Sequence, residues 1–186
     1  MGFKLGKNKV RKTLDYKYFP KNLVELRKII NERYMKFFNL GGIATETIEL
    51  NLNDIDVSQV EDFGWLFGDE AKNVEILDIS QWDTSNVVNM TGMFDDCRKL
   101  KEIIGLENLN VSSVRYITRM FGHCEKLENI DISNWKFKFN CSGIDMFIGC
   151  ENLKEIIGID KFENMKNNEG MFRGCNKLDK PDWYEE

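Results

Sequence analysis

Five cysteines and a single histidine are the residues of this sequence best suited to chemistry. A structural zinc site needs four converging thiolate or imidazole ligands, commonly from Cys-x2-Cys pairs, and no such pair occurs here. Free cysteine packs as a small apolar side chain. The even spacing therefore predicts an inward column of reduced thiols, and we expect Cys141, which lies outside it, to be the most exposed thiol. The column contains Cys97, Cys124, Cys150 and Cys175, at intervals of 27, 26 and 25 residues.

Two further arrangements raise the question of catalysis or cation binding. His123 precedes Cys124, but thiol catalysis needs a base that faces the nucleophile, and sequence neighbours point in different directions. The aspartates of residues 54–58 are spaced like the start of a calcium-binding loop, but Gln59 stands where such a loop needs glycine. We therefore predict a protein that is not an enzyme, with no catalytic residue, no metal and no cofactor.

The cysteines belong to a repeated unit. In four of its copies a Met-Phe pair precedes the cysteine by three residues, and a leucine follows the cysteine by three. A period of 25 to 27 residues lies in the leucine-rich-repeat range, where each unit supplies one short strand and one turn or helix. We expect the phenylalanines of successive copies to stack on one another. The anchoring pairs are Leu66-Phe67, Met93-Phe94, Met120-Phe121, Met146-Phe147 and Met171-Phe172.

Each unit is predicted to contain a strand, a turn and an outer helix. Apolar residues separated by one or two others between Leu100 and Leu106 predict a strand of three or four residues in a parallel sheet. The polar residues 83–86 (DTSN) favour a turn, because their side chains bond nearby backbone amides. Residues 87–94 and 114–121 place apolar side chains at positions i, i+3, i+6 and i+7, which predicts a short helix.

Neighbouring units alternate in type. Residues 77–82 (LDISQW) resemble residues 130–135 (IDISNW), and residues 101–106 (KEIIGL) resemble residues 154–159 (KEIIGI), in both cases 53 residues apart. This superperiod indicates duplication of a two-unit block. One outward strand position then alternates between acidic and apolar residues, in the order Asp78, Ile104, Asp131 and Ile157.

The predicted fold class is an α/β repeat solenoid, a right-handed leucine-rich-repeat solenoid of about five 25–27-residue units with a helical N-terminal cap. Its segments are a basic N-terminal tail (1–17), an N-terminal cap of helix then strand (18–52), the solenoid (53–178) and a C-terminal cap (179–186). The cap helix is expected over residues 20–38, with Pro20 in its first turn. Trp183 and Tyr184 are expected to cover the last unit.

Charge is unevenly distributed along the chain. Five of the 26 basic residues lie within residues 1–14, which contain no acid, so the remainder carries 21 basic and 31 acidic residues, a net charge of −10. Such a body offers no footprint for nucleic acid or anionic lipid. The absence of a signal-peptide pattern and of an 18-residue apolar stretch predicts a cytoplasmic protein.

Several phrases of the sequence resemble the BspA-like leucine-rich-repeat family, bacterial proteins with repeated WDTSNVTNMxxMF motifs. The resemblance rests on residues 78–87 (DISQWDTSNV) and 89–94 (NMTGMF), and on 18–26 (YFPKNLVEL) and 52–58 (LNDIDVS) before the repeats. It extends over roughly residues 18–178 and implies a leucine-rich-repeat fold. It also implies protein binding, since many members are exported surface proteins that bind host proteins, and it supplies no catalytic residues.

These observations predict a non-catalytic module that binds a partner protein through the concave face of the solenoid. The acidic body favours an intracellular inhibitor or adaptor, for example a mobile-element-encoded inhibitor of a nucleic-acid-handling defence enzyme. We expect a partner with a basic surface, no direct nucleic-acid or membrane binding, and a monomer in the free state. The alternatives are a surface-type adhesin and an enzyme with an unrecognised site. The predicted partner-binding residues are Glu75, Asp78, Glu102, Ile104, Glu128, Asp131, Glu155 and Ile157.

Overall fold

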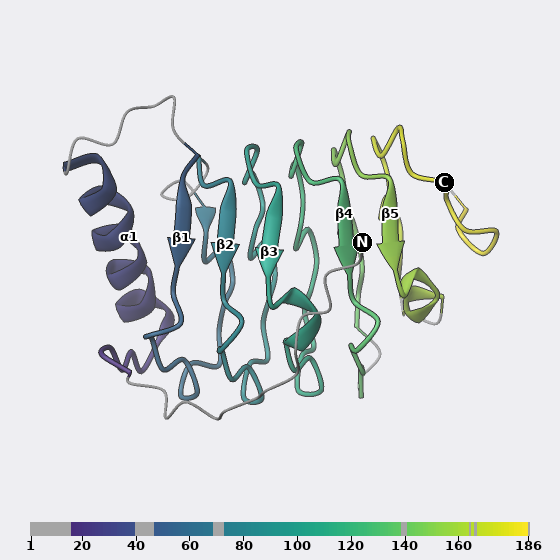
Figure 1. Ribbon diagram of the computed structural model, residues 1–186. Coiled ribbons are helices and arrows are strands. Elements are labelled where there is room, and N and C mark those ends of the chain that lie inside the picture. The colour runs from purple at the N-terminus through teal and green to yellow at the C-terminus, as the bar shows by residue number, and fades with distance from the viewer. Residues whose placement is uncertain are drawn as a thin grey trace, which may run out of the picture.

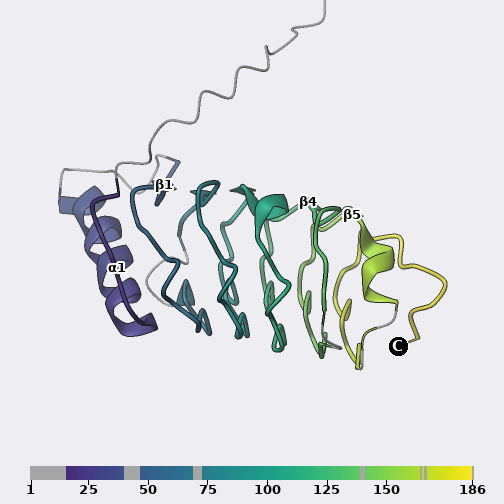
Figure 2. The same ribbon diagram turned by 90° about the horizontal axis from the view of Figure 1, so that it is seen from below.

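The chain winds into successive coils that lie side by side in a row, with helix α1 (Leu23–Asn39) across one end (Figure 1). The computed structural model describes residues 16–39, 47–68, 73–138, 141–163, 165 and 167–185. Short strands line one side of the row and turns line the opposite side (Figure 2). Of the basic tail predicted over residues 1–17, residues 1–15 lie outside the described part.

Each strand is three residues long and buries only its middle side chain, because side chains alternate across a strand. Neighbouring strands pair in parallel, with Leu50 opposite Leu77 and Leu77 opposite Ile103. In the second sheet Ile130 lies opposite Ile156. The predicted strand positions are therefore confirmed. The strands are β1 (Glu49–Asn51), β2 (Ile76–Asp78), β3 (Glu102–Ile104), β4 (Asn129–Asp131) and β5 (Glu155–Ile157).

The strands form two sheets rather than one, because no ladder joins β3 and β4 in the part of the chain that the structure describes. Directly after β3, Gly105 takes a left-handed conformation (φ 90°) and leads into the 3-10 helix η1 (Leu106–Asn108), which contacts β4. Gly158 (φ 92°) and the 3-10 helix η2 (Ile159–Phe162) follow β5 in the same way. The split is thus the structural counterpart of the 53-residue alternation in the sequence.

The opposite side of the row is a continuous wall of turns, which we call the turn wall and define as residues 62–68, 89–97, 116–124, 142–150 and 167–175. Every second backbone N–H of one coil donates to a carbonyl of the next coil, at 2.8 to 2.9 Å in the second coil. Isolated parallel bridges such as Asn89 to Tyr116 and Tyr116 to Ser142 continue along the whole wall. In the second coil the donors are Met90, Gly92, Phe94 and Asp96, and the acceptors are Tyr116, Thr118, Met120 and Gly122.

The prediction of outer helices over 87–94 and 114–121 is wrong, since each segment contains an isolated bridge residue followed by turns and no helix. A helix would need each N–H to bond four residues back, but here alternate N–H groups bond to the neighbouring coil. Left-handed residues also interrupt each segment, Gly92 at φ 58° and Arg119 at φ 56°. The apolar spacing that suggested a helix reflects successive tight turns.

Between the strands and the turn wall lies a core built on stacked aromatic rings. Phe94 and Phe121 stack at 5.4 Å between ring centroids, and Phe121 and Phe147 at 5.2 Å. Phe67 and Phe172 extend the same stack at its two ends. The predicted stacking of the repeat phenylalanines is confirmed.

Both ends of the stack are covered. Asn22 accepts a hydrogen bond from the Glu25 backbone N–H at 3.0 Å and caps α1, so the helix begins at Leu23 and Pro20 precedes it, contrary to the predicted start. Leu26 and Ile30 of α1 are buried against the first coil. At the other end the buried Tyr184 packs edge-on against Phe172, as expected for a C-terminal cap.

Candidate protein-binding face

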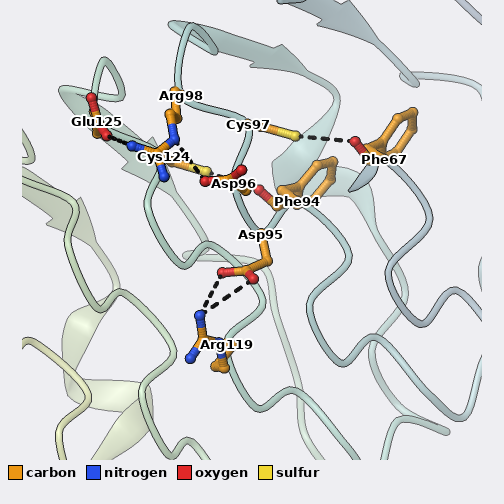
Figure 3. A network of polar contacts seen from close by, with 9 residues as sticks. All are labelled: Phe67, Phe94, Asp95, Asp96, Cys97, Arg98, Arg119, Cys124 and Glu125. Atoms are coloured by element: carbon orange, nitrogen blue, oxygen red, sulfur yellow. Dashed lines mark hydrogen bonds and ion pairs between the residues drawn. The ribbon is translucent and has the colours of Figure 1, made fainter. Parts of the chain in front are cut away.

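The cysteine column points into the core, as predicted, and all four thiols are buried. Each sulfur donates a hydrogen bond to a phenylalanine carbonyl of the preceding coil: Cys97 reaches Phe67 at 3.6 Å and Cys124 reaches Phe94 at 3.2 Å (Figure 3). Burial raises the pKa of Cys97 to about 12. Such thiols pack and do not react.

Cys141 corrects our expectation, because it is buried (1% exposed) rather than the most exposed thiol. Its sulfur donates to the Val114 carbonyl at 3.1 Å. Val60, Val87 and Val114 occupy the corresponding inward place in earlier coils, each 27 residues before the next, and Cys141 follows at the same interval. The shorter fourth unit disguised this column, since Cys141 stands six residues before its phenylalanine whereas the valines stand seven before theirs.

We expect thiol labelling of the folded protein to be slow and to begin at Cys175. A hydrogen bond from Cys150 lowers the pKa of Cys175, whereas burial raises the pKa of Cys141 to about 11. Cys175 also lies in the last coil, where local opening needs least energy. A Cys175→Ser variant should lose the fastest labelling phase. Rapid labelling of Cys97 or Cys124 in native protein, followed by mass spectrometry of peptides, would contradict the inward column.

The predicted partner-binding residues all lie on the strand side of the row. We call this surface the strand face, and it consists of the outward side chains of residues 49–51, 75–78, 101–104, 128–131 and 154–157. Ile104 and Ile157 are 41% and 46% exposed, and among the described residues they are the only isoleucines in the group of exposed large apolar side chains. The register places Asp78 beside Ile104 and Asp131 beside Ile157, as predicted.

Two of the eight residues are neutralised by lysines of the adjacent coil. Lys101 pairs with Glu75 at 2.5 Å, and Lys154 pairs with Glu128 at 2.6 Å. Among the ion pairs of the described residues, none involves Glu102 or Glu155. The acidic character of the strand face therefore comes from residues within the strands rather than from those just before them.

Asp78 and Asp131 have a structural as well as an electrostatic role. Each carboxylate accepts the backbone N–H two residues later, Ser80 at 3.1 Å and Ser133 at 2.8 Å, and so fixes the turn after its strand. Burial opposes ionisation of Asp78, but hydrogen bonds from Asn53 and Ser80 lower its pKa overall. Hydrogen bonds from Ser133 lower the pKa of Asp131. Both groups are therefore charged at neutral pH.

The turn wall carries polar features that the sequence did not reveal. Buried Asp95 lies 3.4 Å from Arg119 of the next coil, and desolvation raises the pKa of Asp95 despite this cation (Figure 3). Arg98 joins Asp96 to Glu125 of the next coil, with both contacts at 2.7 Å. These pairs link successive coils. They could not be found from sequence because each pairing depends on which residues of neighbouring coils lie opposite each other.

A hollow of about 550 Å³ lies between α1 and β1, where Arg33 pairs with Asp54. Its lining mixes Lys17 and Lys36 with Glu32, so no single ligand charge is favoured. No three metal-ligating side chains lie together within the described residues. The described residues contain no helix with the length and apolar character that a membrane span requires.

A family model described as "Mycoplasma protein of unknown function, DUF285" matches residues 37–158 and again 66–183, so that only the first 36 and the last three residues are unmatched. The chain belongs to the DUF285 family. The two DUF285 matches overlap and are offset by roughly one coil, as expected when a repeat aligns in two registers. No curated protein and no solved structure is significantly similar to the chain.

Proposed function

We propose that this DUF285 chain is a non-catalytic module that binds a partner protein through its strand face. The exposed isoleucines Ile104 and Ile157, each beside a carboxylate on the neighbouring strand, are the observation that carries the proposal. Large exposed apolar side chains among polar ones are typical of protein–protein contacts. The repeating coils present them in a line, which suits an extended contact.

The proposal includes the class of fold. The 25–27-residue period, the parallel strands and the stacked phenylalanines support a right-handed leucine-rich-repeat solenoid like that of the BspA-like family. In such solenoids the strand side is the usual recognition surface. The strand face would then be the functional surface and the turn wall the scaffold.

The partner's chemistry follows from the charge of the face. Glu102, Asp131 and Glu155 give it a negative field, which favours a partner with a basic surface and speeds their encounter. An inhibitor or adaptor of a nucleic-acid-handling protein fits this requirement. The five free thiols suit the reducing environment of the cytoplasm, where we place this activity.

Capture of a partner from lysate of the native host, at two salt concentrations, supplies the ligand for the decisive test. We expect Ile104→Ala with Ile157→Ala to speed dissociation at least about tenfold, because apolar anchors mainly set the off-rate. Asp78→Asn with Asp131→Asn should slow association and reduce its salt dependence. Asparagine keeps the oxygen that accepts the Ser80 or Ser133 N–H, whereas lysine would remove it.

Tyr116→Ala is the matched control, because Tyr116 is exposed (57%) but lies on the turn wall. It should leave both rate constants unchanged in surface plasmon resonance. If both strand-face variants bind normally and Tyr116→Ala weakens binding, the functional surface is the turn wall and the proposal is wrong.

A further inference from the structure

Three acidic residues of the strand face lack a cationic partner in the first sheet. Glu49, Asp78 and Glu102 lie on β1, β2 and β3, and the ion pairs of the described residues include none of them. Lys101, which pairs with Glu75, is the only basic residue among the strand-face residues of this sheet. Four acids against one base leave this part of the strand face with a net charge of −3.

The turn wall is different, because arginines neutralise aspartates of successive coils. Arg119 lies 3.4 Å from Asp95, and Arg173 lies 2.9 Å from Asp145. An added cation gains most where the carboxylates have no such partner. The distribution of charge therefore favours the strand face of the first sheet as the place where further cations bind.

The chain itself holds such cations in residues 1–14, which contain five basic residues and no acid and which we call the basic segment. These residues lie outside the described part, but the position of the chain directly after them is known. The Lys17 backbone N–H donates to the Asp54 carbonyl at 2.8 Å, and Lys17 lines the hollow beside Glu49 of β1. The basic segment therefore joins the described chain at the β1 end of the strand face.

The basic segment is long enough to reach every strand of the first sheet. Fifteen residues precede Tyr16, and an extended chain of this length spans up to about 50 Å. Paired strands lie about 4.8 Å apart, so β3 is only about 10 Å from β1. Because the segment is tethered beside the face, its effective concentration there is about millimolar, and individually weak ion pairs are sufficient.

We infer that the basic segment docks on the strand face of the first sheet, with its cations against Glu49, Asp78 and Glu102. Apolar residues interspersed among the cations would cover the exposed Ile104. The inference goes beyond the proposed function, because it gives the strand face an occupant within the same chain. A basic partner protein would have to displace this segment.

Carbodiimide cross-linking of the full chain tests this docking, because the reagent joins a lysine amine to a carboxylate only where the two are in contact. An equimolar mixture of unlabelled and isotope-labelled chains shows whether each link lies within one chain or between two. After digestion, mass spectrometry should identify links within one chain from the basic segment to Glu49, Asp78 or Glu102. The link between Lys101 and Glu75, which lie 2.5 Å apart, is the internal positive control. The lysines available in the segment are Lys4, Lys7, Lys9 and Lys12.

Two triple variants that remove the same charge decide where the segment docks. The strand-face variant should lower the total yield of segment links, to any carboxylate, several-fold. The control variant changes exposed carboxylates of the last two coils and should leave that yield unchanged. The Lys101–Glu75 link should persist in both variants, which shows that the first sheet is intact. The strand-face variant is Glu49→Gln, Asp78→Asn and Glu102→Gln. The control variant is Glu151→Gln, Glu163→Gln and Glu169→Gln.

Three results of the cross-linking overturn the inference. They are segment links spread evenly over the carboxylates of all coils, segment links only between two copies, and no segment link beside a strong Lys101–Glu75 link. Equal total yields in the two triple variants overturn it as well. None of these measurements involves the captured partner, so the proposed function stands or falls separately, on the rate constants of the variants described for it.

Discussion

Phe121→Ala should lower the free energy of unfolding by about 4 kcal/mol, near the middle of the range for buried phenylalanine truncations. Phe121 is fully buried, and its ring stacks on Phe94 and Phe147 with interplanar angles of 15° and 1°. Removing it opens a cavity at the centre of the stack and breaks two aromatic contacts at once. Urea denaturation followed by tryptophan fluorescence measures the loss.

Tyr116→Ala provides the comparison within the same coil. The Tyr116 ring is more than half exposed, at 57%, so its truncation should change the free energy of unfolding by no more than about 0.5 kcal/mol. If Phe121→Ala costs less than about 1 kcal/mol, the ring is not held in a close-packed core. The continuous aromatic stack would then be incorrect.

Gly105→Ala should lower the free energy of unfolding by about 3 kcal/mol or more, combining left-handed backbone strain with a forced displacement of packed atoms. Gly105 has φ 90°, and a Cβ atom there would lie 2.2 Å from the Cα of Ser80 in the preceding coil. That neighbour is backbone and cannot rotate away. The coil would have to move, which disturbs the β2–β3 ladder.

Gly158→Ala separates the two contributions, because Gly158 occupies the corresponding place 53 residues later. Its φ is 92°, but a Cβ would lie 3.0 Å from the nearest atom, the Cα of Ser133. The strain of about 1 to 2 kcal/mol should then dominate, with only a small displacement of the neighbouring coil. Equal losses in the two variants, measured by urea denaturation, would show that close approach of the coils is unimportant at Gly105.

The repeat pattern predicts the strands and the stacked rings because both follow from side chains that recur at a fixed period. The middle strand residues and the phenylalanines are inward in every coil, so a single sequence column identifies each. The prediction of outer helices was wrong for a different reason. Turns of three residues and helices both bring every third or fourth side chain to one face, and only backbone conformations such as that of Arg119 distinguish them.

The strand face was predictable because outward strand positions follow directly from inward ones. The ion pairs of the strand face were harder to predict from sequence, because the contact between Lys101 and Glu75 depends on which residues of neighbouring coils lie opposite each other. The gap between β3 and β4 depends on the left-handed Gly105 and the helical turn after it, although the 53-residue alternation already pointed to two kinds of unit. Cys141 was misjudged because one deleted residue hid its column.

The turn wall has an implication for how such chains change in length during evolution. Its regular hydrogen bonds between coils join main-chain atoms, so this part of the contact forms whatever the outward side chains are. A duplicated segment can therefore dock onto its parent without new complementary residues. Because neighbouring units alternate in type with a 53-residue period, the smallest segment whose duplication keeps this alternation is a two-coil block of 53 residues. Family members should differ in size by whole blocks, each adding one more acid–isoleucine pair to the strand face.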